Sequence, residues 1–116
     1  MVEFLIVYTL EAHPLGTNNP YSQREVPGKY SRDPIGEPIG QPQTYEGRAL
    51  LATKAGKEDG ILATLLVDRM DNAVWATYGP APNIAYLIGM DGRVLLKQPW
   101  YDPKGMEEAV KALLPK

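Results

Sequence analysis

The chain has 116 residues, of which 44% are hydrophobic and 22% charged, and its formal net charge is −2. These values are ordinary for one soluble globular domain. No apolar run approaches the roughly 18 residues of a membrane span, and no cluster of basic residues typical of a nucleic-acid-binding protein is present. Cysteine is absent, which excludes a disulfide, a thiolate metal site and a cysteine nucleophile within this chain. The N-terminus carries no basic segment before an apolar stretch, so we expect no signal peptide and a cytoplasmic location.

Glycine and proline are concentrated in one part of the chain. Each occurs eleven times, and ten of these 22 residues lie between residues 14 and 43. The repeated prolines block both helical and strand patterns there. We expect residues 14–43 to form a long ordered loop that wraps a single domain, 1–116, with a flexible binding loop as the alternative.

The rest of the chain shows regular patterns. In chain order they predict a strand at 2–9, a helix at 44–56, a strand at 64–67, a helix at 70–78, strands at 83–88 and 93–98, and a helix capped by Asp102. The first strand is continuously apolar over residues 4–8, which predicts burial on both faces. In the first helix Thr44 is a good N-cap, and Tyr45, Ala49 and Ala52 share one face.

The last helix has the clearest amphipathic pattern. Asp102 and Pro103 are typical of a helix start, and Glu107 and Lys111 form an i,i+4 pair. The apolar stripe consists of Met106, Ala109, Val110, Leu113 and Leu114.

Alternating strands and helices require parallel strands joined by crossovers. The turn at residues 90–93 then predicts an antiparallel hairpin. We therefore expect an α/β fold with a mixed sheet of about four strands, two parallel crossovers and a C-terminal β-hairpin, with helices packed on it.

Six short motifs follow one another in an order found in one family. They are Glu11-Ala12-His13 after the first strand, Gln41-Pro42-Gln43-Thr44, the segment containing Val67, Asp68, Met70, Asp71 and Asn72, Tyr78-Gly79 followed by Pro82 and Tyr86, Asp91-Gly92-Arg93, and residues 99–107. With these motifs, nearly the whole chain resembles the iodothyronine deiodinase family of redoxins. The resemblance implies a thioredoxin-like fold, of which the predicted elements are the second half.

The resemblance also implies a missing part. Family members carry a reactive selenocysteine or cysteine on a strand–turn–helix unit that precedes the Glu-Ala-His strand, where this sequence starts. We therefore expect a truncated thioredoxin-like fold without redox catalysis of its own. Ile84 stands where the family has an arginine that helps to hold the substrate carboxylate, which argues against an iodothyronine substrate.

Glu11 and His13 are the candidate catalytic residues. They follow the first strand, at the end where open α/β sheets bind ligands, and Glu11 could orient the imidazole of His13 for proton transfer. The resemblance implies proton handling beside a selenolate. Because no thiolate is present, we favour a structural or vestigial role, with ligand binding as the alternative. A metal site would need further ligands such as Asp68 or Asp71, so neither a metal nor another cofactor is expected.

Two further sets of candidate residues lie next to predicted strands. Asp68, Asp71 and Asn72 are expected to form a structural cluster that caps the second helix. Pro82 and Asn83 are the candidate substrate-loop residues, and the resemblance implies a cis peptide bond at Pro82.

The implied missing strand would lie between the strands at 2–9 and 83–88. We expect these two apolar edges to pair directly or to be covered by a second chain, most simply in a homodimer, and we expect neither a nucleic-acid nor a membrane partner. Three functions remain open: a non-catalytic binding or oligomerisation module, a thiol or selenol oxidoreductase whose nucleophile lies upstream or in a partner chain, and a small-ligand or metal-binding protein that uses Glu11 and His13.

Overall fold

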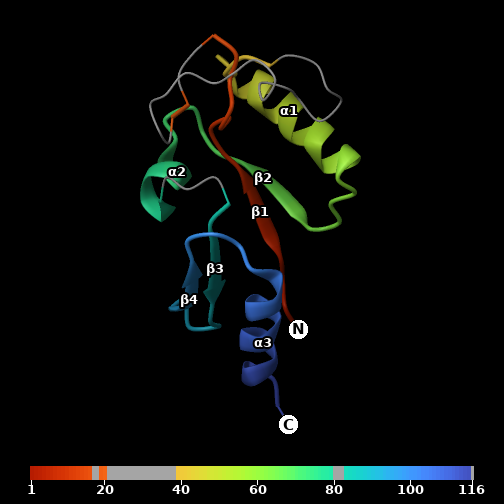
Figure 1. Cartoon of the computed structure of the whole chain (residues 1–116), viewed down its shortest axis with the longest axis vertical. Coiled ribbons are helices and arrows are strands. Elements are labelled where there is room, and N and C mark those ends of the chain that lie inside the picture. Colours follow the sequence, from red (N-terminus) through yellow and green to blue (C-terminus); the bar gives the residue numbers. More distant parts are fainter. Residues whose placement is uncertain (17–18, 21–38, 80–82, 116) are drawn as a thin grey trace. The chain divides into compact units, whose positions relative to one another are not determined.

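The structure is a computed structural model that describes residues 1–16, 19–20, 39–79 and 83–115 (Figure 1). The chain divides into two compact units, unit 1 (Met1–Pro80) and unit 2 (Ala81–Lys116), and each is described by itself. Within the described ranges, no helix is both long and apolar enough to cross a membrane.

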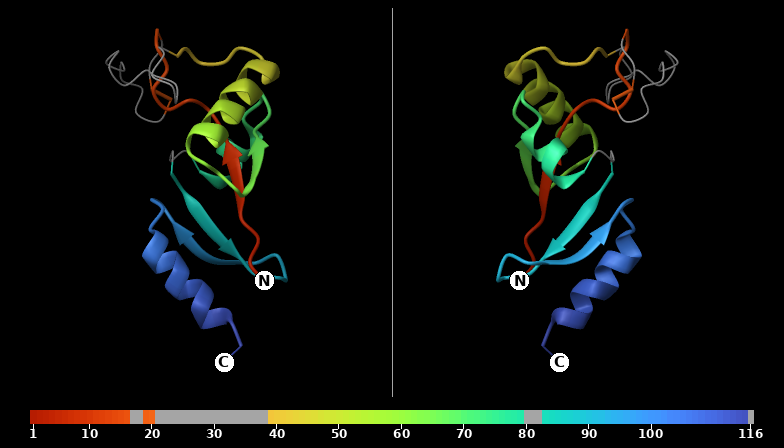
Figure 2. Two further views of the ribbon diagram at one scale, coloured as in Figure 1. Left: turned by 90° about the vertical axis from the view of Figure 1, so that its right-hand side faces the viewer. Right: turned by 90° about the vertical axis from the view of Figure 1, so that its left-hand side faces the viewer.

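Unit 1 is built on two parallel strands. β1 (Leu5–Tyr8) pairs in register with β2 (Thr64–Val67), so that Leu5 lies beside Thr64 and Tyr8 beside Val67. α1 (Tyr45–Glu58) precedes β2 in the chain, and α2 (Ala73–Tyr78) follows it. The two helices lie on opposite sides of the strands (Figures 1 and 2). This arrangement confirms the α/β class and one of the two expected parallel crossovers.

α1 begins where the sequence predicts and packs closely on β2. The hydroxyl of Thr44 accepts a hydrogen bond from the Gly47 amide at 3.0 Å. A Cβ atom at Gly56 would lie 3.1 Å from a methyl carbon of Leu65, so glycine allows the close approach of helix and strand. The predicted helix face of Tyr45, Ala49 and Ala52 is only partly buried, because Ala52 is buried whereas Tyr45 is exposed.

α2 is shorter than expected because its first turn is replaced by an irregular one. The helix was expected from residue 70 and starts at Ala73, since Asn72 adopts a left-handed conformation with φ of 57°. Gly79, with φ of 116°, ends the helix as expected.

Unit 2 contains the expected antiparallel hairpin and the last helix. β3 (Ala85–Ile88) pairs with β4 (Val94–Gln98), with an irregularity in register between Leu87 and Ile88. The hairpin turn closes through a hydrogen bond from the Gly92 amide to the Gly89 carbonyl at 2.9 Å. α3 (Pro103–Leu113) starts at the predicted cap, because Asp102 Oδ1 accepts from the Lys104 amide at 3.2 Å.

The expectation of a single mixed sheet of about four strands is wrong. The described strands form two two-stranded sheets, β1–β2 in unit 1 and β3–β4 in unit 2. Sequence patterns locate strands but carry no information on which free edges meet, because pairing depends on non-local contacts.

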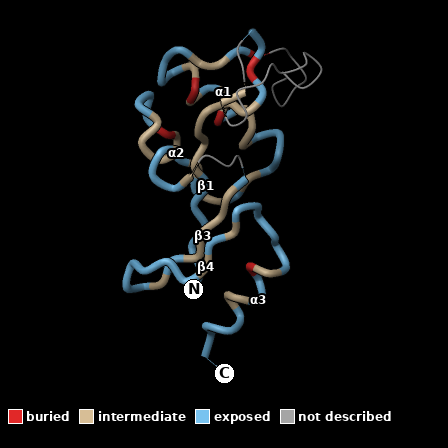
Figure 3. Tube along the Cα trace, turned by 60° about the vertical axis from the view of Figure 1, so that its left-hand side comes forward, coloured by how far each residue is buried: buried red, intermediate tan, exposed pale blue. Residues whose placement is uncertain are grey.

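Buried positions are few and cluster around α1 and the turn before α2, with one in α3 (Figure 3). Among the described residues, the buried apolar side chains are Pro14, Ile39, Ala52 and Met106, whereas Arg48 and Asp68 are buried although they are charged. The first strand was expected to be buried on both faces, and this is wrong for its first half, because Leu5 and Ile6 are exposed. The apolar run therefore describes side chains that are available for packing, not side chains that unit 1 itself covers.

Candidate functional site

The candidate site of unit 1 lies at the carboxyl ends of β1 and β2. Because the two strands are parallel and in register, the segments that follow them leave the sheet at the same end. The Asp68 amide donates to the Tyr8 carbonyl at 2.8 Å, which extends the pairing by one residue. The structure thus brings the segment that contains Glu11 and His13 to the same end of the sheet as the Asp68–Asn72 turn.

Glu11 is held from two directions. Its carboxylate accepts a hydrogen bond from the Tyr8 hydroxyl at 2.7 Å. Its main chain is held by the side chain of Gln41, which accepts from the Glu11 amide at 2.9 Å and donates to the Glu11 carbonyl at 3.1 Å. A side-chain amide that pairs with both main-chain groups of one residue imitates a neighbouring strand. Glu11 is therefore a fixed, half-buried carboxylate.

The chain after Glu11 is pinned to the chain before α1. The Leu15 amide donates to the Ile39 carbonyl at 2.6 Å, and Leu15 forms a single bridge with Gly40. Pro14 is fully buried, whereas His13 beside it is exposed. The two described ends of the segment 14–43 are therefore joined, and most of that segment lies outside the described residues.

The carboxylate of Asp68 caps α2 from a distance in sequence. Oδ1 accepts from the amides of Arg69 at 2.9 Å and Val74 at 3.0 Å, and Oδ2 accepts from the Trp75 amide at 3.0 Å. Helix starts leave amides without intrahelical partners, and a carboxylate satisfies them with the favourable sign for the helix dipole. Three main-chain donors thus compensate a side chain that is only 1% exposed.

Arg48 was not singled out by sequence reasoning, although it is the other buried charge, at 1% exposed. Its guanidinium donates from Nη1 to the carbonyls of Asp68 at 3.1 Å and Arg69 at 2.7 Å. Nη2 donates to Oδ1 of Asn72 at 2.9 Å. Arg48 thereby ties α1 to the turn that follows β2. The available signal was its spacing, since Arg48 and the buried Ala52 are four residues apart on one helix face.

The three residues of the predicted polar cluster have different roles. Asn72 occupies the N-cap position of α2, but its side chain makes no capping bond and binds Arg48 instead. Asp71 Oδ1 accepts from the Ala73 amide at 3.2 Å. Asp71 also pairs with Arg69, and this hydrogen bond lowers the pKa of the Asp71 carboxyl below its ordinary value and raises the pKa of Arg69.

The candidate substrate-loop residues belong to unit 2 or lie outside the described residues. Asn83 is exposed, and its carbonyl accepts from the Tyr101 amide at 2.7 Å, which ties the start of the hairpin to the segment before α3. Pro82, with the cis peptide bond expected there, lies outside the described residues.

The end of β1 was also considered as a metal site. His13 is the single histidine of the chain, and no group of three acidic or histidine side chains that could hold a metal ion occurs among the described residues.

Comparison with known proteins adds no assignment: no family model, curated protein or solved structure matches this chain.

Proposed function

We propose that the chain is a cytoplasmic, deiodinase-like domain of thioredoxin-like fold that acts as a binding or oligomerisation module and not as a redox enzyme in its own right. The element order supports this proposal, because a parallel strand–helix–strand unit is followed by a short helix, an antiparallel hairpin and a C-terminal helix. The absence of cysteine removes the usual redox nucleophile.

The observation that carries the proposal is the exposed apolar surface of the β1–β2 sheet. On one face of this sheet Leu5 is 57% exposed and Leu66 44%, because their positions in the register turn both side chains to the same side. In a parallel sheet both faces are normally covered, and a two-stranded sheet is marginal without further strands or covering elements. The sheet of unit 1 therefore has the properties of an interface and not of a finished surface.

The partner we propose is a second copy of this chain. An isologous interface uses the same patch on both copies, so one contact would cover the apolar face of each. Residues 1–10 carry one charged side chain before Glu11, at Glu3, so few charges oppose such a contact. A homodimer would thus cover apolar side chains that unit 1 by itself leaves exposed.

Size-exclusion chromatography with light scattering tests this proposal at micromolar protein. We expect a molar mass equal to that of two chains. Leu5→Asp should lower the molar mass to that of one chain, because a carboxylate in an apolar interface costs several kcal/mol. Leu62→Asp is the matched control, since Leu62 is fully exposed but lies outside the strands. A folded single-chain species for the unsubstituted protein would rule out the homodimer.

A second candidate is a thiol or selenol oxidoreductase whose nucleophile lies upstream or in a partner chain. It is favoured by the way Glu11 is fixed at the carboxyl end of β1 by Tyr8 and Gln41, which suits a group that manages protons beside a nucleophile. The DNA upstream of the codon for Met1 is the test. An in-frame cysteine or TGA codon about thirty codons earlier, the span of a strand–turn–helix unit, would support this candidate, whereas stop codons there would remove an upstream nucleophile.

A further inference from the structure

The chain contains two Asp-Gly pairs, Asp59-Gly60 and Asp91-Gly92. All four residues are exposed, and each glycine has a positive φ, of 61° at Gly60 and 82° at Gly92. A glycine after an aspartate leaves its main-chain nitrogen free of steric hindrance from a Cβ atom. The two pairs therefore offer the same chemistry in two different surroundings.

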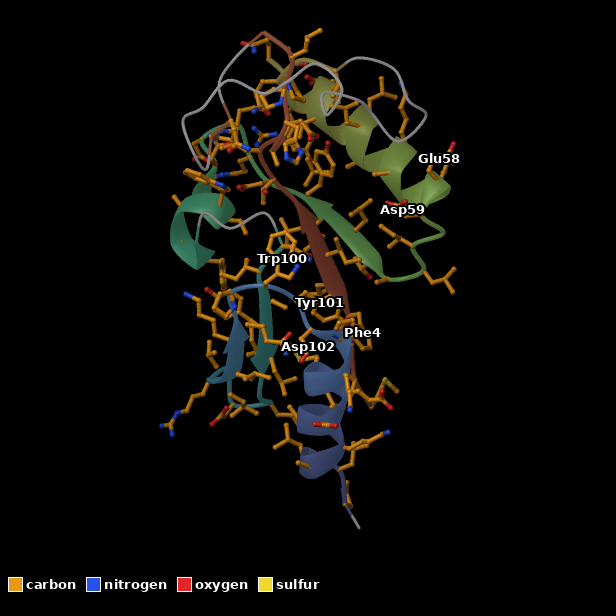
Figure 4. All side chains as sticks on the ribbon, viewed as in Figure 1. Phe4, Glu58, Asp59, Trp100, Tyr101 and Asp102 are labelled. Carbon is orange, nitrogen blue, oxygen red and sulfur yellow. The ribbon has the colours of Figure 1, made fainter. Side chains whose placement is uncertain are left out.

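Asp59 is loosely held at the end of α1, where Figure 4 labels it beside Glu58. Within the described part of the chain, no hydrogen bond or ion pair engages its carboxylate. The following amide, of Gly60, donates to the Lys57 carbonyl at 3.3 Å, beyond the usual range for such a bond. This bond belongs to the last turn of the helix, where local opening is easiest.

Asp91 is held more firmly in the β3–β4 turn. Its Oδ1 accepts from the Arg93 amide at 3.1 Å, and its Oδ2 lies 3.7 Å from Arg93 Nε. The Gly92 amide donates to the Gly89 carbonyl at 2.9 Å. Both reacting groups of this pair are therefore engaged, whereas at Asp59-Gly60 only the amide makes a hydrogen bond, and that bond is longer.

We propose that Asp59-Gly60 is a site of spontaneous backbone isomerisation. The Gly60 nitrogen attacks Cγ of the protonated Asp59 side chain, an N–Cγ bond forms, and the Cγ–O bond breaks with loss of water. Water then adds to either carbonyl of the cyclic imide. Opening at the main-chain carbonyl leaves an isoaspartate, in which the chain runs through the former side chain. The net change is an isomerisation without oxidant or cofactor.

The product would disturb the connection from α1 to β2. The Ile61 amide donates to the Gly56 carbonyl at 2.9 Å, which together with the Gly60 bond closes the helix end. Isoaspartate adds one carbon atom to the main chain between Asp59 and Gly60. The added atom displaces Ile61 from Gly56, so the modified protein should lose this closure.

Peptide mapping of the whole protein after prolonged incubation at 37 °C and mildly acidic pH tests the proposal. Trypsin separates the two sites, because residues 58–69 and 70–93 form different peptides. We expect about fivefold more isoaspartate in the first peptide than in the second, the factor that one ordinary hydrogen bond supplies. Electron-transfer fragmentation identifies the isomer, and incubation in ¹⁸O-labelled water reports each passage through the imide.

The control is the same incubation in denaturing urea, where both pairs should react at similar rates because the folded contacts are gone. Asp59→Glu should abolish the signal in peptide 58–69 while circular dichroism remains that of the folded chain. Equal rates in the folded protein, or faster reaction at Asp91, would overturn the proposal.

Discussion

The two units are stabilised in different ways. Unit 1 buries two charged side chains, Arg48 and Asp68, at the end of a parallel strand pair. Unit 2 buries an apolar one, Met106, on a helix that follows an antiparallel hairpin. In unit 1 the charges are compensated mainly by main-chain groups, three amides for Asp68 and two carbonyls for Arg48.

The difference shows what each unit depends on. A buried charge costs several kcal/mol unless hydrogen bonds compensate it, so the end of the β1–β2 sheet depends on the specific geometry of the bonds that Asp68 and the two Nη atoms of Arg48 make. An amphipathic helix tolerates changes in apolar shape, so unit 2 depends on volume and pattern. Unit 1 therefore has a polar site with defined positions, whereas unit 2 has a simpler apolar contact.

The largest expected effect is that of Asp68→Ala. The substitution leaves three main-chain amides without their acceptor and removes the negative charge that faces the start of α2, so we expect a loss of about 3 kcal/mol in the free energy of unfolding. Trp75 reports on α2 when Trp100 is replaced by Phe, so urea unfolding followed by fluorescence measures the change.

Asp68→Asn is the graded control, because it keeps one acceptor oxygen but loses the charge, and its effect should fall between those of the unsubstituted chain and Asp68→Ala. An Asp68→Ala variant with unchanged stability would contradict the role of the carboxylate as the cap of α2.

Met106→Ala is expected to cost somewhat less, about 2 kcal/mol, because it removes most of one buried side chain from α3. The reporter is Trp100, with Trp75 replaced by Phe. Met106→Leu, which nearly conserves volume, should restore most of the loss. The exposed Glu108→Ala on the same helix should leave stability unchanged. An equal loss in the free energy of unfolding in Met106→Leu and Met106→Ala would contradict a contact that depends on side-chain volume.

Local signals made most element ends predictable from sequence. Thr44 and Asp102 cap the helices that follow them, and Gly79 ends α2. These features depend on neighbouring residues, so the sequence specifies them directly. The start of α2 was mispredicted because the left-handed backbone of Asn72 is accompanied by a hydrogen bond from Arg48, 24 residues away in sequence.

Non-local features could not be predicted in the same way. The strand patterns did not reveal that the strands form two sheets, because the unpaired edges look alike in sequence. Burial of Arg48 was missed because arginine on a helix surface is normally solvated. For the candidate site, the sequence placed Glu11 correctly after β1 but gave no sign of the Gln41 clamp, which joins residues thirty positions apart.

Gln41→Ala tests that clamp and should cost about 1 kcal/mol, since it removes two hydrogen bonds from a half-buried main-chain segment. Hydrogen exchange of the Glu11 amide, which loses its acceptor, is the direct readout. Gln41→Glu keeps an acceptor for that amide but removes the donor to the Glu11 carbonyl, so it should slow exchange relative to Gln41→Ala. Unchanged Glu11 exchange in Gln41→Ala would contradict the clamp.

The smallest effect belongs to Asp71, an exposed charge that contrasts with the buried Asp68. Its hydrogen bond from Arg69 lowers the pKa of the Asp71 carboxyl, so its contribution to stability is present above the ordinary carboxyl pKa and is lost as the pH falls through the lowered one. Asp71→Asn should therefore change stability slightly at neutral pH and not at all once the Asp71 carboxyl of the unsubstituted chain is protonated. Salt should reduce the difference, because the pair with Arg69 is exposed. A difference that stays the same at every pH would contradict a contribution through the charge of Asp71.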